Sequence, residues 1–279
     1  MAVDSVHDLV AELHLERQRR SASEQLLAKI AGSRLLAPAR LVHRLTGRGP
    51  DLADAARAAA AAPPAAPVPD DITRMVIDDF HRIYYDAAST TWQDTRWLGH
   101  RAMKLPSDLW LYQELIVETC PDLIIETGTH DGGGALYLAC VCELIGNGRV
   151  ITVDITEYPT RPSHPRLEFV VASSVEPATV AMLAERAEGQ RTMVILDSEH
   201  TEAHVTAELE ALSPLVSVGC HLVVEDTNIH GHPVCPEFPR GPAEALIPFL
   251  HAHDDFEVDP RDGKFLVSFN PGGVLRRVR

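Results

Sequence analysis

The chain lacks the features that mark membrane, secreted and disulfide-rich proteins. It has no uninterrupted apolar run long enough to span a membrane. Its N-terminal stretch, MAVDSVHDLVAELHLERQRR, carries acidic residues where a secretory signal has a basic and then an apolar segment. Its five cysteines are odd in number and scattered, so they indicate no disulfide framework. From these absences we expect a cytoplasmic protein without a transmembrane segment.

Positive charge is also scarce. The 279 residues include 25 Lys plus Arg against 40 Asp plus Glu, which gives a formal net charge of −15. A general nucleic-acid binder needs a basic face, so this balance argues against a nucleic-acid partner. Hydrophobic residues make up 45% of the chain and charged residues 23%, which is an ordinary globular composition.

An Ala/Pro stretch divides the chain into two regions. The segment AAAAAPPAAPVPD (58–70) reads as a linker, because consecutive prolines remove backbone donors and forbid regular helix. Residues 1–70 are therefore expected to form a helical appendage, and residues 71–279 the main domain. Apolar residues recur at helical spacing in the appendage: Val3, Val6, Val10, Leu13, Leu35, Leu36, Leu41 and Leu45. We expect these helices to pack against another subunit of a homo-oligomer. The arginines beside the second stripe also suit a membrane surface or an acidic partner.

The main domain alternates strand-like and helix-like segments. Apolar, β-branched runs are predicted as strands at 123–127, 149–154, 166–172, 192–197 and 220–226. Helices are predicted between and after them at about 133–145, 176–188, 201–213 and 242–252. This alternation predicts an α/β fold with a Rossmann-like, doubly wound, mostly parallel sheet. Segments 256–259 and 264–270 can add two final strands, one of them antiparallel at the edge.

Acidic residues gather where these strands end. Ligands of doubly wound sheets lie at the carboxyl ends of the strands. The residues at or just after these ends include Glu126, Asp154, Ser173, Ser174, Asp197, Glu225 and Asp226. Like charges at one sheet edge repel each other unless a cation or ligand hydroxyls intervene. The edge is therefore expected to bind such a partner.

A glycine-rich turn follows the first of these strands, in DLIIETGTHDGGG (122–134). Its spacing departs from the G-x-G-x-x-G of dinucleotide sites, and Glu126 precedes it, where a pyrophosphate would be repelled. A carboxylate suits a cationic ligand such as S-adenosylmethionine, and Asp154 is placed to accept hydrogen bonds from ribose hydroxyls. The alternative is that the glycines only allow close packing of helix on strand.

A second group of polar residues follows the later predicted strands. Asp197, Glu225 and Asp226 are hard oxygen ligands that suit Mg²⁺, and His200 lies three residues after Asp197. The alternative is structural: Asp197 can cap the next helix, and Glu225 can be an exposed strand-end residue.

The segments ETGTHDGGGALYLA, ILDSEHT, VVEDTN and GHPV…GPAEAL occur in this order. With TRWLGHRAMKLPSDLWLYQELI (95–116) and FLVSFNPGGVLRR (265–277), they resemble the cephalosporin hydroxylase/macrocin O-methyltransferase-type families. These are metal-dependent, S-adenosylmethionine-using O-methyltransferases of sugar and natural-product tailoring, with a class I methyltransferase fold. The resemblance covers most of 80–279 and leaves residues 1–70 outside it.

The resemblance implies a role for each matching residue. His200 is the implied general base. Mg²⁺ or Mn²⁺ is the implied metal, held by Asp197, Glu225 and Asp226. Gly134 stands where serine is often found, so the resemblance does not imply the hydrogen bond that a serine would make to the ligand. The implied cofactor-binding residues are Glu126, Gly128, Thr129, Gly132, Gly133, Gly134, Asp154, Ser173, Ser174 and Asp197. Lys104, Asp108 and Tyr112 are expected to wall the cofactor pocket.

The leading hypothesis is an O-methyltransferase that acts on a deoxysugar hydroxyl of a glycosylated small molecule. Two alternatives remain open. One is methylation of a non-sugar hydroxyl, such as that of a β-lactam or phenolic intermediate. The other is a non-catalytic binding protein that retains the fold. A nicotinamide dehydrogenase is disfavoured by the glycine spacing.

Overall fold

The computed structural model describes residues 71–279, so the predicted helical appendage and linker (1–70) lie outside the described residues. The described part contains a seven-stranded sheet in the order β5-β4-β3-β6-β7-β9-β8. Its strands are β3 (Leu123–Thr127), β4 (Arg149–Asp154), β5 (Leu167–Val171), β6 (Thr192–Leu196), β7 (His221–Val224), β8 (Phe256–Val258) and β9 (Val274–Arg277). The five strands predicted from 123 to 226 are confirmed, with ends that differ by up to two residues.

The sheet is mostly parallel. Strands β5, β4, β3, β6 and β7 pair in parallel, whereas β9 pairs antiparallel with both β7 and β8. The prediction of a strand at 256–259 is confirmed by β8. The prediction of a strand at 264–270 is wrong. Backbone amides of this segment are used in tight turns, with Lys264 N donating to Arg261 O and Leu266 N to Gly263 O. The antiparallel strand is β9, and it lies inside the sheet rather than at its edge.

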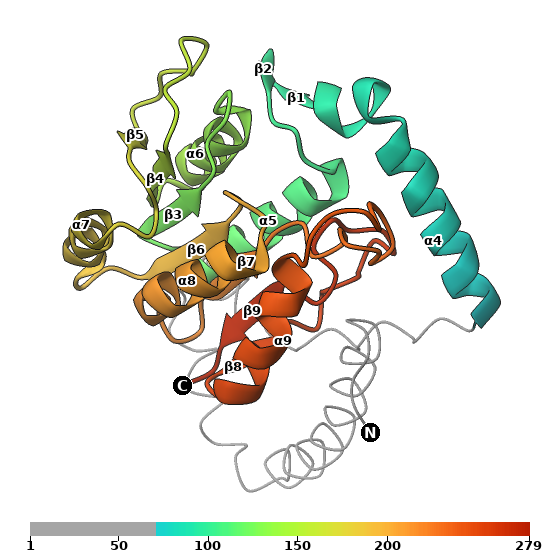
Figure 1. Ribbon diagram of the computed structural model, residues 1–279. Helices are drawn as coiled ribbons and strands as arrows, with labels where there is room; N and C mark the ends of the chain where they lie inside the picture. The colour runs from blue at the N-terminus through green and yellow to red at the C-terminus, as the bar shows by residue number, and fades with distance from the viewer. Residues whose placement is uncertain (1–70) are drawn as a thin grey trace, which may run out of the picture. The chain divides into compact units, whose positions relative to one another are not determined.

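Helices cover both faces of the sheet (Figure 1). They are α4 (Asp71–Asp86), α5 (Pro106–Thr119), α6 (Gly133–Ile145), α7 (Pro177–Ala187), α8 (Glu202–Leu212) and α9 (Pro242–Ala252). Helix α5 packs on α6, and α8 packs on α9. Crossovers between parallel strands are right-handed, and the chain moves in opposite directions along the sheet through α6 and through α8. These two helix pairs therefore lie on opposite faces. The predicted helices from 133 to 252 are confirmed.

Short elements complete the described part. They are the antiparallel pair β1 (Arg96–Trp97) and β2 (His100–Arg101), and the 3₁₀ turns η2 (Ala88–Thr90), η3 (Trp92–Asp94) and η4 (Ser213–Leu215). The β1–β2 hairpin contacts α6. The backbone of Arg101, in β2, lies close to Gly133 at the end of the glycine turn.

The central strands explain why the sheet forms where it does. All five residues of β3 and all five of β6 are buried, as continuous apolar runs in a covered parallel sheet should be. Local signals bound the helices as well. Pro106 begins α5, and Gly146 ends α6 in the left-handed conformation. The buried core contains residues from α5, α6 and the central strands.

This strand order, with an antiparallel strand inserted before the last one, is that of the Rossmann-like class I methyltransferase fold. The predicted fold class is thus confirmed. Among residues 71–279, none of the helices combines the length and the apolar character needed to cross a membrane.

Candidate functional site

The carboxyl ends of β3, β4 and β6 meet at one edge of the sheet. These three strands are adjacent and parallel, with Thr127 opposite Val153 on one side and Leu196 on the other. Side chains at or just after the strand ends therefore share this edge. The predicted grouping of acidic residues is a consequence of this register.

The glycine turn lies at the centre of this edge, and three of its glycines leave no room for a side chain. Gly128 has a φ of +82°, and a Cβ placed on it would lie 1.6 Å from the carbonyl oxygen of Asp197. A Cβ on Gly132, at φ +80°, would lie 2.8 Å from Pro162 Cδ, and one on Gly133 would lie 2.2 Å from the carbonyl oxygen of Arg101. The turn is thus pressed against three separate segments. The packing role of these glycines is observed directly.

Asp154, at the end of β4, organises this turn. Its Oδ2 accepts hydrogen bonds from the backbone N–H of Thr129 (3.0 Å) and of His130 (2.8 Å), and its Oδ1 accepts one from Thr156 N (2.8 Å). Arg161 lies 3.4 Å from Oδ2. A carboxylate offers about four acceptor positions, so one is left on Oδ1 for a ribose hydroxyl. The predicted pair of ribose hydrogen bonds to Asp154 stays a prediction.

Glu126, on β3, is held by the neighbouring strand β4 through one of its carboxyl oxygens. The hydroxyl of Thr152 donates to Glu126 Oε2 at 2.7 Å, and Thr129 Oγ1 lies 2.6 Å from Thr152 Oγ1. Burial raises the pKa of Glu126 to about 8. A carboxyl held in this way is well suited to a cationic group that replaces its lost hydration.

The two serines after β5 differ in their surroundings. Ser174 is buried, and its hydroxyl lies 3.3 Å from His204 Nε2. Ser173 is half-buried, and its backbone carbonyl accepts a hydrogen bond from Glu176 N. Their predicted contact with the cofactor stays a prediction.

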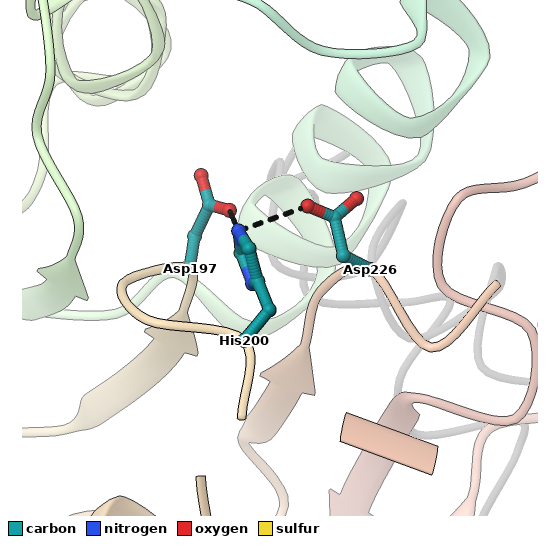
Figure 2. Close-up of side chains that lie close together, drawn as sticks. All are labelled: Asp197, His200 and Asp226. Carbon is teal, nitrogen blue, oxygen red and sulfur yellow. Dashed lines mark ion pairs between the residues drawn. The ribbon is translucent and has the colours of Figure 1, made fainter. Parts of the chain in front are cut away.

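Asp197, His200 and Asp226 converge on one point (Figure 2). His200 Nε2 lies 3.1 Å from Asp226 Oδ2 and 4.0 Å from Asp197 Oδ1. One ligand atom from each residue lies within 4.8 Å of the other two, which is the spacing of groups that can share a metal ion. Burial raises the pKa of both aspartates above the usual range. A bound cation would offset the cost of keeping them ionised.

Asp226 is held in place by a distant segment. It has a φ of +55°, which non-glycine residues adopt rarely, and its backbone N–H donates to Asn270 Oδ1 at 3.0 Å. Asn270 in turn donates to Tyr112 Oη at 2.7 Å. Sequence reasoning did not select Asn270, although the segment 265–277 that contains it is part of the family resemblance.

Glu225 is placed differently from the prediction. It is buried, and its Oε1 accepts a hydrogen bond from Lys104 Nζ at 2.6 Å. The same ammonium donates to Asp197 Oδ2 at 2.6 Å. The predicted metal ligands are Asp197, Glu225 and Asp226. The side chains whose ligand atoms converge in the structure are Asp197, His200 and Asp226. The physical reason is that Glu225 lies beside a buried cation of the protein itself. Its role as a third metal ligand stays a prediction.

A mostly parallel sheet of this order, with a glycine turn beside a carboxylate–histidine cluster, defines a class I methyltransferase fold with a candidate metal site. The model of the family Rhamnosyl O-methyltransferase/CmcI matches residues 89–278. The chain belongs to this family. The resemblance and the O-methyltransferase assignment predicted from the motifs are therefore confirmed.

Individual relatives agree with this membership. The Rhamnosyl O-methyltransferase of Mycobacterium leprae is 37% identical over 213 residues, which cover 74% of this chain and 92% of that protein. The protein of the same name from Mycobacterium tuberculosis is 39% identical over 214 residues, which cover 72% of this chain and 85% of that protein.

Solved structures support the fold. The apo structure of CmcI-N160 aligns with a TM-score of 0.53 at 20% identity, over 67% of this chain and 77% of that one. The structure of CmcI-D160 with Mg and SAM aligns with a TM-score of 0.52 at 20% identity, over 67% of this chain and 78% of that one.

Proposed function

We propose that this protein transfers the methyl group of S-adenosylmethionine to a hydroxyl of a deoxysugar, of the rhamnosyl type, in a glycosylated natural product. The observation that carries the proposal is the convergence of Asp197, His200 and Asp226 beside the glycine turn. The relatives named Rhamnosyl O-methyltransferase support the choice of a sugar acceptor.

The residues around the turn fit S-adenosylmethionine. The sulfonium and the α-amino group of this cofactor are cationic, and the buried carboxyl of Glu126 supplies a matching acceptor. Gly128 and Gly132 pack tightly against neighbouring segments, which fixes the backbone of the turn that would contact the cofactor. The structure of CmcI-D160 contains both Mg and SAM, which supports the same pair of cofactors here. We therefore propose all ten residues predicted from the sequence as the cofactor site.

The residues around His200 fit a divalent cation. Carboxylate oxygens are the ligands that Mg²⁺ and Mn²⁺ prefer, and those of Asp197 and Asp226 converge. When bound, such a cation lowers the pKa of a coordinated hydroxyl and so eases its deprotonation. We propose these two aspartates as ligands. Whether Glu225 adds a third carboxylate is decided by comparing Mn²⁺ affinity in Glu225→Gln and in Asp226→Asn.

We propose His200 as the general base. A neutral imidazole is a general base that can accept the proton lost by the hydroxyl. Asp226 Oδ2, 3.1 Å from Nε2, stabilises the positive charge that results. As the new oxygen–methyl bond forms, the sulfur–methyl bond breaks and its electron pair stays on sulfur. The products are the methyl ether, S-adenosylhomocysteine and the proton on His200. The in-line alignment of sulfur, methyl and oxygen must come from the way the site positions both substrates.

Methyl transfer to a panel of rhamnosylated metabolites, followed by mass spectrometry, tests the activity. We expect a mass increase of one methylene on the sugar, loss of turnover after EDTA treatment, and recovery with Mg²⁺ or Mn²⁺. Phenolic and β-lactam acceptors belong in the same panel. Turnover of these alone would overturn the sugar assignment, and full turnover in chelated protein would overturn the metal.

The base is tested with His200→Ala. We expect a loss of about 10²–10⁴ in methylation rate, the usual worth of general-base catalysis, with S-adenosylmethionine affinity nearly unchanged. His251→Ala is the matched control, because His251 is exposed at the end of α9. Normal turnover in His200→Ala would remove the base from the mechanism.

A further inference from the structure

Lys104 is a buried cation among the acidic residues of the site. It lies just before α5, and its side chain is 4% exposed. Its Nζ donates to Asp197 Oδ2 and to Glu225 Oε1, each at 2.6 Å. A lysine so deeply buried requires partners of opposite charge, and these two carboxylates supply them.

The two oxygens of Asp197 serve different partners. Oδ2 faces Lys104, whereas Oδ1 faces His200 Nε2 at 4.0 Å. A carboxylate is planar, so a hydrogen bond that fixes one oxygen also fixes the direction of the other. The ammonium of Lys104 therefore fixes Oδ1 in a direction towards the point where His200 and Asp226 converge. Figure 2 shows Asp197 with these two residues.

Space for Lys104 depends on Gly134, in the first turn of α6. A Cβ placed on Gly134 would lie 2.9 Å from Lys104 Cε and 3.3 Å from Glu126 Oε1. The first contact is shorter than real Cβ atoms tolerate, and Lys104 Cε is near the flexible end of its side chain. A side chain at position 134 would thus shift the ammonium without a change in the backbone.

We propose that Lys104 is a positioning residue of the metal site, and that Gly134 leaves the room its side chain needs. This inference rests on the proposed metal-dependent function. Without the ammonium, Asp197 and Glu225 would be two close carboxylates that repel each other, and Asp197 would lose its fixed orientation. Lys104 holds the oxygen of Asp197 that faces away from His200, so it orients this ligand and leaves the converging oxygen free.

Binding of Mn²⁺ to the full-length protein, measured by electron paramagnetic resonance without any acceptor, tests this role. We expect Lys104→Met to weaken Mn²⁺ binding by about 10–100-fold, the usual cost of losing a group that orients a metal ligand. Gly134→Ala should give a smaller loss in the same direction. Lys264→Met is the control, because Lys264 is an exposed lysine whose carboxylate partner is Glu114, and its affinity should equal that of the wild type.

A positioning role also predicts how turnover responds. The Mn²⁺ concentration needed for half-maximal rate should rise in Lys104→Met, whereas the rate at saturating Mn²⁺ should recover. A merely structural role would instead lower the melting temperature and the saturated rate together. If Lys104→Met does not fold, Gly134→Ala carries the test, because the atom closest to its Cβ lies near the end of the flexible Lys104 side chain.

The outcomes separate this inference from the function on which it rests. A wild-type protein that binds no Mn²⁺ would overturn the proposed metal, and this inference with it. A wild type that binds Mn²⁺, with unchanged or tighter binding in Lys104→Met and Gly134→Ala, would overturn only the positioning role. Tighter binding would show that the ammonium competes with the metal ion.

Discussion

Gly128 joins the glycine turn to the candidate metal site, and its substitution by alanine tests this connection. The backbone carbonyl of Asp197 lies 1.6 Å from the place where a Cβ on Gly128 would be, and the carbonyl carbon lies 2.4 Å away. Ordinary van der Waals contact for such a Cβ begins at 3.4 Å, so the Asp197 oxygen is about 1.8 Å too close. Both obstructing atoms belong to the main chain, which cannot rotate out of the way.

Two costs add in Gly128→Ala. The residue has a φ of +82°, and an L side chain in the left-handed region costs about 1–2 kcal/mol. Forcing extra volume into a packed region costs about 1–3 kcal/mol more. We expect a destabilisation of roughly 2–5 kcal/mol, together with a displacement of Asp197. A folded variant should therefore lose affinity for S-adenosylmethionine and for Mn²⁺ at the same time.

Gly146→Ala provides the matched control. Gly146 has a similar φ of +74°, but nothing lies within 4 Å of its hypothetical Cβ. It should lose only the conformational cost of about 1–2 kcal/mol and keep both affinities. Urea denaturation followed by circular dichroism measures the stabilities, and isothermal titration measures the affinities. Equal destabilisation of the two variants, with both affinities kept in Gly128→Ala, would refute the reasoning.

Three further predictions follow from the structure. Asp154→Ala should weaken S-adenosylmethionine binding by about 1–3 kcal/mol, measured by calorimetry, because it leaves backbone amides of the glycine turn without an acceptor; an unchanged dissociation constant would remove Asp154 from the cofactor site. Asp259→Asn should cost about 3–5 kcal/mol in urea denaturation at pH 7, since it breaks a buried charged pair. Although burial alone would raise it, hydrogen bonds from Arg261 and His221 hold the pKa of Asp259 well below its usual range. The stabilisation by Asp259 is therefore present above the unfolded-state pKa, near 3.9, and is lost as the pH falls towards the folded-state value; a variant with the same acid sensitivity as the wild type would contradict this. A chain that begins at Asp70 should change its oligomeric mass in light scattering and still bind cofactor, and loss of binding at constant mass would place the appendage in the catalytic core.

The sequence predicts the fold best where a residue pattern is compatible with only one secondary structure. The runs that form β3 and β6 are apolar and β-branched, and a parallel sheet covered on both faces requires such runs. The C-terminal region is different. KFLVSFN has the composition of a strand, yet Phe269 packs against the rings of Tyr84, Tyr85 and Trp92 and donates its amide to Asp108. These partners lie far away in the chain, so local pattern alone assigns the segment wrongly.

The sequence also predicts the site only in part, because it does not give the orientation of single side chains. Parallel topology alone brings the strand-end acids to one edge, which is why Asp197 and Asp226 could be selected from the sequence. Topology does not say which way consecutive side chains point. Glu225 and Asp226 are neighbours in the chain, but one pairs with Lys104 and the other with His200. Lys104 is 93 residues from Asp197 and 121 from Glu225, so no motif reveals this partnership.

The position of Lys104 changes how the acidic cluster should be understood. Three carboxylates at a sheet edge would suggest three equivalent ligands, with the metal as their only neutralising charge. The structure instead supplies one positive charge from within the protein, at 2.6 Å from both Asp197 and Glu225. Because a like-charged cluster must be neutralised for the edge to fold, this ammonium lets the acids assemble before any metal arrives. Under the proposed function, a metal ion would bind to a site that is already oriented rather than create it.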